Sequence, residues 1–183
     1  MGKKALDVPA IKKAIEEGRD NGKTDQEIYN ELVPLFYDKR TLALIITGNP
    51  TKENIEKYKV YNNILLGILA LSIVFKFLTV FNLAMSFGQP LLLLLIFVVP
   101  LFTAYFIYEI RRYSAFAYRA CGLLAIAGFL QSIRNTSDAA DVLINLVFAG
   151  SVCFLSFYLD KKLFPKYSPG KLQKDANGEF ILN

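Results

Sequence analysis

Three polar side chains stand within long apolar stretches of this sequence, namely Lys76, Gln131 and Asn145. Charged and amide groups are costly to place in hydrocarbon, and proteins that carry them there often use them in an ion or proton path. Lys76 has a second interpretation, because a lysine stem can lift its ammonium group to the interface beside the hydrocarbon. The sequence favours this second interpretation. It places Gln131, Asn145 and Asp141 at a similar depth, where they could form a polar cluster.

A second set of candidate residues is basic and lies at the ends of the apolar stretches. Arginine forks and lysine ammonium groups bind phosphate oxygens, so these residues could bind an anionic lipid headgroup. They could instead serve only to orient the helices in a membrane, and the sequence favours that interpretation. The set comprises Arg111, Arg112, Arg119, Lys161 and Lys162, with Glu109 and Asp160 among them.

Small residues recur at helical spacing in the last two apolar stretches. Positions three or four apart share one face of a helix, and small side chains let membrane helices approach closely. We therefore expect a packing seam between two helices rather than a ligand groove. Its members are Ala117, Cys121, Ala125, Gly128 and Ser132 in one stretch and Ala149, Cys153 and Ser156 in the other.

The two cysteines of this seam are expected to face each other. Cys121 and Cys153 each lie about six residues, hence ~9 Å, from the same end of two antiparallel helices. Packed helices of this kind place the two Cα atoms within about 10 Å of each other. The pattern predicts reduced thiols that act as small packing residues.

No grouping typical of an enzyme is found in the sequence. It has no histidine, which is the commonest general base and metal ligand. The carboxylates near the apolar stretches divide between the two ends, and no glycine-rich phosphate loop or nucleophile motif is present. A lysine-based dyad for a serine or cysteine stays open. We predict a non-enzymatic protein without a metal or other cofactor.

The elements that must position these residues are long helices. Hydrophobic residues make up 54% of the chain, and the charged residues gather toward its ends. Apolar runs of about 20 residues match a ~30 Å hydrocarbon core. We predict an all-α, polytopic membrane protein in which residues 51–159 form an antiparallel bundle of four transmembrane helices. The spans are expected at about residues 63–81, 91–108, 114–133 and 142–159.

Residues 1–50 are predicted to form a small cytoplasmic helical domain. Three short helices are expected there, and a fourth continues without a break into the first span. Thr24 and Glu27 form a capping box, in which each side chain satisfies a backbone amide of the other residue; Asp7 and Asp38 are expected to cap the other two helices. The third helix is too apolar to meet nucleic acid. Residues 160–183 are predicted to be a cytoplasmic tail of loops, in which residues 180–182 could form a strand.

Basic residues set the expected orientation, because segments rich in lysine and arginine stay in the cytoplasm. The region before Tyr61, the second connection and the tail carry basic clusters, whereas the third connection carries only Arg134. Four spans place every cluster on one side. Both termini are therefore predicted to be cytoplasmic, in the inner or plasma membrane if the protein is bacterial.

Three functions are compatible with this architecture. The leading hypothesis is a membrane component that anchors its helical domain so that the domain engages a partner protein or a larger assembly. An alternative is an oligomeric pore or small-solute transporter lined by Lys76, Gln131 and Asn145. A further alternative is an anionic-lipid-binding protein. The expected partners are the bilayer and a protein or a second copy of the chain, and not nucleic acid.

Overall fold

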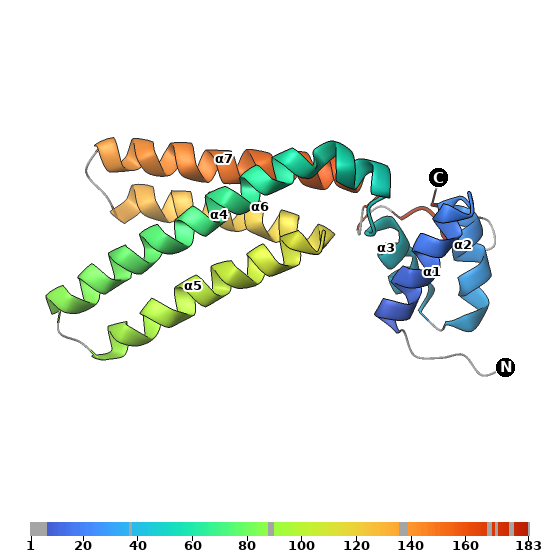
Figure 1. Cartoon of the computed structure of the whole chain (residues 1–183), viewed down its shortest axis with the longest axis horizontal. Helices are drawn as coiled ribbons and strands as arrows, with labels where there is room; N and C mark the ends of the chain where they lie inside the picture. The colour runs from blue at the N-terminus through green and yellow to red at the C-terminus, as the bar shows by residue number, and fades with distance from the viewer. Residues whose placement is uncertain are drawn as a thin grey trace. The chain divides into compact units, whose positions relative to one another are not determined.

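The chain forms helices over almost all of the described residues in the computed structural model (Figure 1). Every named element is a helix, and the described part adds one isolated β-bridge between Lys174 and Phe180. The prediction of an all-α chain is confirmed. The described residues are 7–36, 38–87, 90–135, 139–167, 170, 172–175 and 178–182, with the side chains at 76, 79, 80, 83–87, 90–97, 99, 132, 135 and 139–141 outside the description.

Two compact units make up the chain, and each is described by itself. The small unit contains Met1–Thr51 together with Phe164–Asn183, and the four-helix unit is Lys52–Leu163. The small unit holds α1 (Val8–Asp20), α2 (Asp25–Leu32), a 3-10 turn (Val33–Leu35) and α3 (Lys39–Thr47).

The helices of the small unit begin where their caps were predicted. The Thr24 amide donates to Glu27 Oε2 over 2.7 Å, and the Glu27 amide donates to Thr24 Oγ1 over 3.3 Å, which completes the capping box. Asp38 accepts from the Thr41 amide at 2.9 Å, and Asp7 accepts from the Ala10 amide. These bonds satisfy amides that have no partner within the first turn of a helix.

Arg19 joins the three helices at their ends. Its Nε donates to Asp25 Oδ1 at 2.9 Å, and its other nitrogens donate to the carbonyls of Ile46, Asn49 and Pro50. Ile46 lies in the last turn of α3, and Asn49 and Pro50 follow that helix. The helix itself offers these carbonyls no donor. The sequence predicted only a break in the helix at residues 19–23. It did not predict the contacts that this largely buried guanidinium makes.

The tail folds against the helices of the small unit, which differs from the separate tail of loops that the sequence predicted. Phe180 and Leu182 are buried in one core with Ile28, Tyr29 and Leu42. The side chain of Gln26 accepts from the Leu182 amide at 2.7 Å and donates to the Phe180 carbonyl at 3.2 Å. The amide group of the Gln26 side chain thereby bonds to one backbone N–H and one backbone carbonyl of the tail, as the backbone of a neighbouring strand would. The two ends of the chain thus build a single core.

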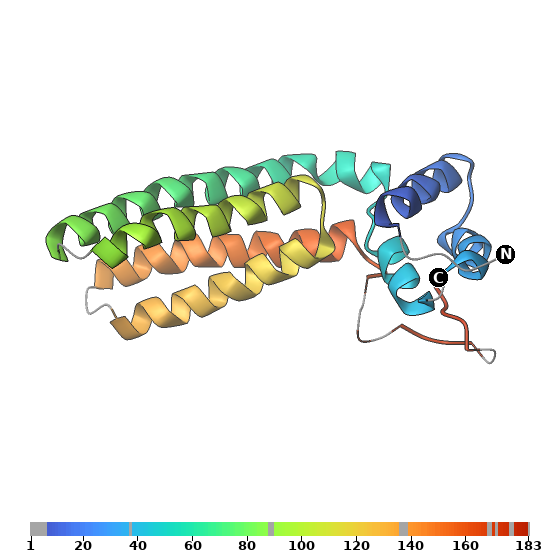
Figure 2. The ribbon, with the colours of Figure 1, turned by 90° about the horizontal axis from the view of Figure 1, so that it is seen from below.

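The four-helix unit consists of two helical hairpins. Figures 1 and 2 show α4 beside α5 and α6 beside α7, and α4 also packs against α7. Helices α5 and α6 contact each other over fewer residues than the helices of these three pairs do. All four predicted spans fall on helices. Their bounds are α4 (Lys52–Phe87), α5 (Pro90–Arg111), α6 (Ala115–Asn135) and α7 (Ala139–Leu163).

Two of these helices, within the described part of the chain, are long and apolar enough to cross a membrane. The stretches are Lys52–Phe75 and Val142–Leu163, and α6 contributes a shorter apolar stretch, Ala115–Gln131. Much of α5 has side chains outside the description. The structure therefore contains two candidate spans, which is fewer than the four predicted from the sequence.

Candidate functional site

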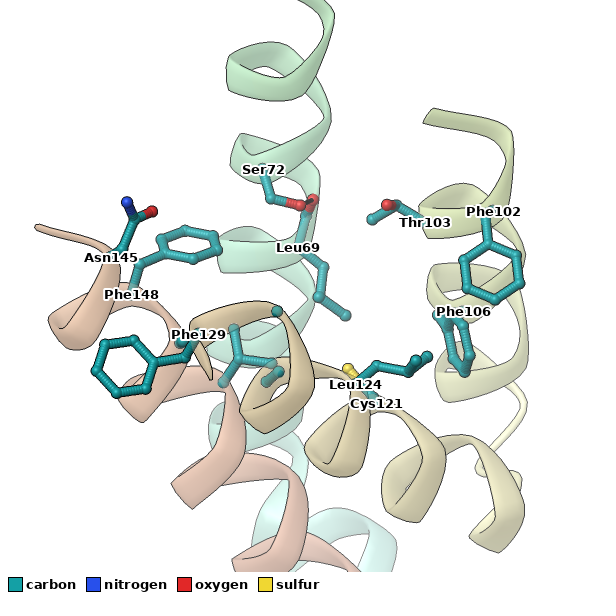
Figure 3. Close-up of a pocket in the computed structure, with 14 residues that line it drawn as sticks. Leu69, Ser72, Phe102, Thr103, Phe106, Cys121, Leu124, Phe129, Asn145 and Phe148 are labelled. Carbon is teal, nitrogen blue, oxygen red and sulfur yellow. Dashed lines mark hydrogen bonds between the residues drawn. The ribbon is translucent and has the colours of Figure 1, made fainter. Parts of the chain in front are cut away.

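A cavity of about 380 Å³ lies between the two hairpins, and all four helices contribute to its wall. Figure 3 shows Ser72 and Leu69 of α4 facing the interior, opposite Thr103 and Phe106 of α5. α6 and α7 complete the wall. Each contributing segment lies away from the ends of its helix, so the cavity occupies the middle of the unit.

The wall of the cavity is mostly apolar, with a few polar side chains in it. Phenylalanine rings from α5, α6 and α7 line much of the surface. The Ser72 hydroxyl donates to the Leu69 carbonyl of its own helix at 2.7 Å, and Ser72 and Thr103 are both buried. Asn145 of α7 is exposed at the wall. Among the side chains that the structure describes, those of the wall carry no charge, so they suit an apolar occupant.

A buried hydrogen bond joins helices of the four-helix unit outside the cavity wall. The Tyr118 hydroxyl of α6 lies 2.7 Å from Asn62 Oδ1 of α4 and 3.3 Å from the Ile110 carbonyl of α5. Tyr118, Asn62 and Ile110 are almost completely buried. One tyrosine thus links three helices. Loss of this bond would leave a buried polar atom without a partner and would lower the stability of the unit.

A charged pair joins α6 to α7 in the same region of the unit. Arg119 Nε donates to Asp160 Oδ2 at 2.8 Å, and the Asp160 side chain is largely buried. The other carboxylate oxygen of Asp160 and the hydroxyl of Ser156 are buried, and neither has a hydrogen-bond partner among the described residues. Ser156 lies one turn before Asp160 on α7, so both acceptors stand on the same face of that helix.

The predicted small-residue seam divides between two locations. Cys121, Ala125, Gly128 and Ala149 line the cavity, whereas Ala117 and Ser156 are buried elsewhere in the unit. A side chain added at Gly128 would meet no atom within 4 Å, but one added at Gly122 would lie 2.9 Å from the Phe157 ring. Gly122 therefore marks a close approach of α6 to α7 that the spacing did not predict. The side chain of Ser132 lies outside the description.

The two cysteines do not form a disulfide in the structure. Cys121 is buried at the cavity wall, and Cys153 is half-buried on α7. The expected separation of their Cα atoms stays a prediction.

The predicted basic set does not act as one group. Arg119 donates to Asp160, whereas Arg112, directly after α5, donates to the hydroxyl of Tyr108 in that helix at 2.6 Å. Arg111, Lys161 and Lys162 are exposed. A headgroup site at these residues stays a prediction, and Arg119 is the member that already serves a structural contact.

The polar candidates of the apolar stretches have different surroundings. Asn145 is at the cavity wall, and Gln131 is exposed on α6 without lining the cavity. The side chains of Lys76 and Asp141 lie outside the description. A cluster of these groups, or a pore that they line, stays a prediction.

Sequence reasoning missed the tie made by Tyr118 and Asn62. Each lies beside another polar residue, Asn63 or Arg119, at the edge of an apolar run, and the two are 56 positions apart. Their only signal was a hydrogen-bonding group on the expected inner face of a helix. Among the described residues, no three histidine, cysteine or acidic side chains lie close enough to hold a metal ion.

Comparisons with protein-family models, with curated proteins and with solved structures found no match to this chain.

Proposed function

We propose that this protein is a non-enzymatic, multi-pass membrane component whose four helices anchor a folded domain that engages a partner protein or a larger assembly. The observation that carries the proposal is the composition of the small unit. Its core combines Ile28 and Tyr29, which precede α4, with Phe180 and Leu182, which follow α7. Segments that share a core must lie on the same side of a bilayer.

The shared core supports an even number of membrane crossings. The four-helix unit begins directly after Thr51 and ends directly before Phe164. A chain whose two flanking segments lie on one side of a bilayer crosses it two or four times, and not three times. Four crossings by α4 to α7 agree with the two hairpins and with the predicted spans.

The outer surface of the four-helix unit also supports placement in a bilayer. Only 28% and 22% of the most apolar windows in α4 and α7 are buried within the chain. Large apolar side chains such as Ile144, which is 66% exposed, face outward along these helices. A core helix of a water-soluble protein buries its apolar residues, whereas hydrocarbon accepts them on the outside. Basic residues near the small unit favour the cytoplasm as its compartment.

Cysteine labelling tests the topology directly. In a background of Cys121→Ala and Cys153→Ala, single cysteines at Gly2, Ser137 and Gly178 are exposed to an impermeant maleimide on intact cells. We expect only the cysteine at position 137 to react from outside, because two crossings lie on either side of it. Labelling of position 2 and position 178 from opposite sides would contradict both the shared compartment and the even number of crossings.

The engagement of a partner is tested by the mass of the complex in mild detergent. The native chain should carry a stoichiometric protein partner, and Phe180→Ala should release it because that change removes a core side chain of the small unit. Ile181→Ala changes the neighbouring, more exposed position and should retain the partner. A chain that is monomeric in every form would contradict the proposal.

The cavity favours a second function, the binding of an apolar ligand by the four-helix unit. This function differs from the predicted anionic-lipid site, because the basic residues of that site are not among the described side chains that line the cavity.

A further inference from the structure

We propose that the cavity between the hairpins holds one hydrocarbon chain of a bilayer lipid. The proposal rests on the membrane placement of α4 to α7 given under the proposed function. It goes beyond that function because it assigns a ligand to a defined internal site.

The first support is the chemistry of the wall. Rings such as Phe106 and Phe148 point into the space in Figure 3, and the hydroxyl of Ser72 is already bonded to its own helix. A water molecule enclosed in a protein needs two to four polar partners, and genuinely apolar cavities stay free of water. The wall therefore offers far more to a hydrocarbon chain than to a cluster of water molecules.

The second support is the size of the cavity. Its volume is about 380 Å³. If each methylene group occupies about the ~30 Å³ of a water molecule, the space accepts a chain of roughly a dozen carbons. That is most of one lipid tail, but it is too small for an additional helix.

The third support is the route into the cavity. Helices α5 and α6 diverge from the connection at residues 112–114 (Figures 1 and 2) and meet less than the other neighbouring pairs. Phe102 of α5 and Leu124 of α6 both line the cavity, yet they are 56% and 46% exposed. The apolar wall is thus continuous with the apolar outer surface, so a lipid chain can enter sideways without leaving hydrocarbon.

The experiment uses the full chain in vesicles of phosphatidylcholine and phosphatidylglycerol in which one acyl chain carries a diazirine. After illumination, the crosslinked positions are mapped by mass spectrometry. The variants are Gly128→Phe, which places a ring into open space at the cavity wall, and Gly150→Phe. Gly150 is an exposed glycine of α7 with equally open space and does not line the cavity, so it is a matched control.

We expect crosslinks at Phe106 and Val152, which line the cavity and are buried, to exceed those at Leu101 and Phe154 of the outer surface. Gly128→Phe should reduce the cavity crosslinks by roughly tenfold, as expected when a competing group takes the site, and Gly150→Phe should leave them unchanged. The excess in the native chain is decisive even where Gly128→Phe fails to fold.

Three results would overturn the proposal, and they are distinguishable. Equal labelling of the cavity and the outer surface would mean that the lipid only surrounds the helices, while the membrane placement would stand. Crosslinks from the cavity to a second copy of the chain would assign the space to self-association. Absence of crosslinks from all four helices would remove the membrane placement itself.

Discussion

The small unit buries isoleucine, leucine and tyrosine side chains. Ion pairs such as Lys23 with Glu31 lie at its surface, and its largely buried pair, Arg19 with Asp25, joins helix ends outside that core. The four-helix unit has the opposite distribution. Its outer surface carries leucine, valine and phenylalanine, while Asn62, Ser156 and Asp160 are buried inside it. The same chain therefore contains one unit arranged for water and one arranged for hydrocarbon, because apolar groups face the solvent that accepts them.

The largest expected effect is on the core that the two ends of the chain share. Phe180→Ala removes a buried ring from the small unit, and replacements of this kind cost about 3–5 kcal/mol. Hydrogen exchange on the full chain should show lost protection in α1, α2 and α3, with α4 to α7 unchanged. Ile181→Ala, at a more exposed position, is the control. Loss of protection in α4 to α7 as well would mean that the two units do not fold independently.

The second largest effect is expected from a charge placed on the outer surface of the four-helix unit. Ile144→Lys places an ammonium group where hydrocarbon is expected and should disfavour membrane insertion by about 3 kcal/mol. Val8→Lys makes the same change at an exposed position of the small unit and should have no measurable effect. The fraction of chain in the membrane pellet after carbonate extraction measures both. Equal insertion of the two variants would contradict a hydrocarbon environment around α7.

Loss of the buried hydrogen bond between Tyr118 and Asn62 is expected to have a smaller effect than either of these two changes. Tyr118→Phe removes the hydroxyl from Asn62 Oδ1 and leaves that buried acceptor unpaired, which costs about 1–3 kcal/mol. The midpoint of thermal unfolding in detergent should fall. Tyr105→Phe makes the same change on α5 at an exposed ring and is the control. Equal midpoints for the native chain and Tyr118→Phe would show that the bond adds no stability.

These comparisons show how far the sequence could predict each unit. The caps at Thr24 and Asp38 were predictable because a cap involves residues only three positions apart. The docking of the tail was not, because Gln26 and Phe180 are 154 positions apart and no local pattern relates them. Apolar periodicity likewise located the helices, whereas the cavity depends on how two hairpins diverge, a property of packing between α5 and α6.

A smaller change concerns the capping box of the small unit. Thr24→Ala removes the hydroxyl that accepts from the Glu27 amide, and loss of such a cap costs about 1 kcal/mol. Hydrogen exchange should report faster opening of residues 25–28 in the variant. The helices of the four-helix unit lie outside the small unit and should show no change. Unaltered exchange in α2 would mean that the cap contributes nothing in the full chain.

The smallest expected effect is a loss of stability in the small unit at acidic pH, and it follows from the Asp38 carboxyl. Hydrogen bonds from the Thr41 hydroxyl and then the Thr41 amide hold the pKa of the Asp38 carboxyl below its ordinary value. A carboxyl with a lowered pKa stabilises the folded state above about pH 4, the usual pKa of aspartate, and this stabilisation is lost as the pH falls through the lowered value. We therefore expect exchange at the start of α3 to be constant between about pH 7 and 5, after correction for intrinsic rates, and to accelerate below about pH 4. Thr41→Val removes the hydroxyl bond and should flatten that acid response. An equally steep response in Thr41→Val would show that the cap of α3 does not set the acid sensitivity of the small unit.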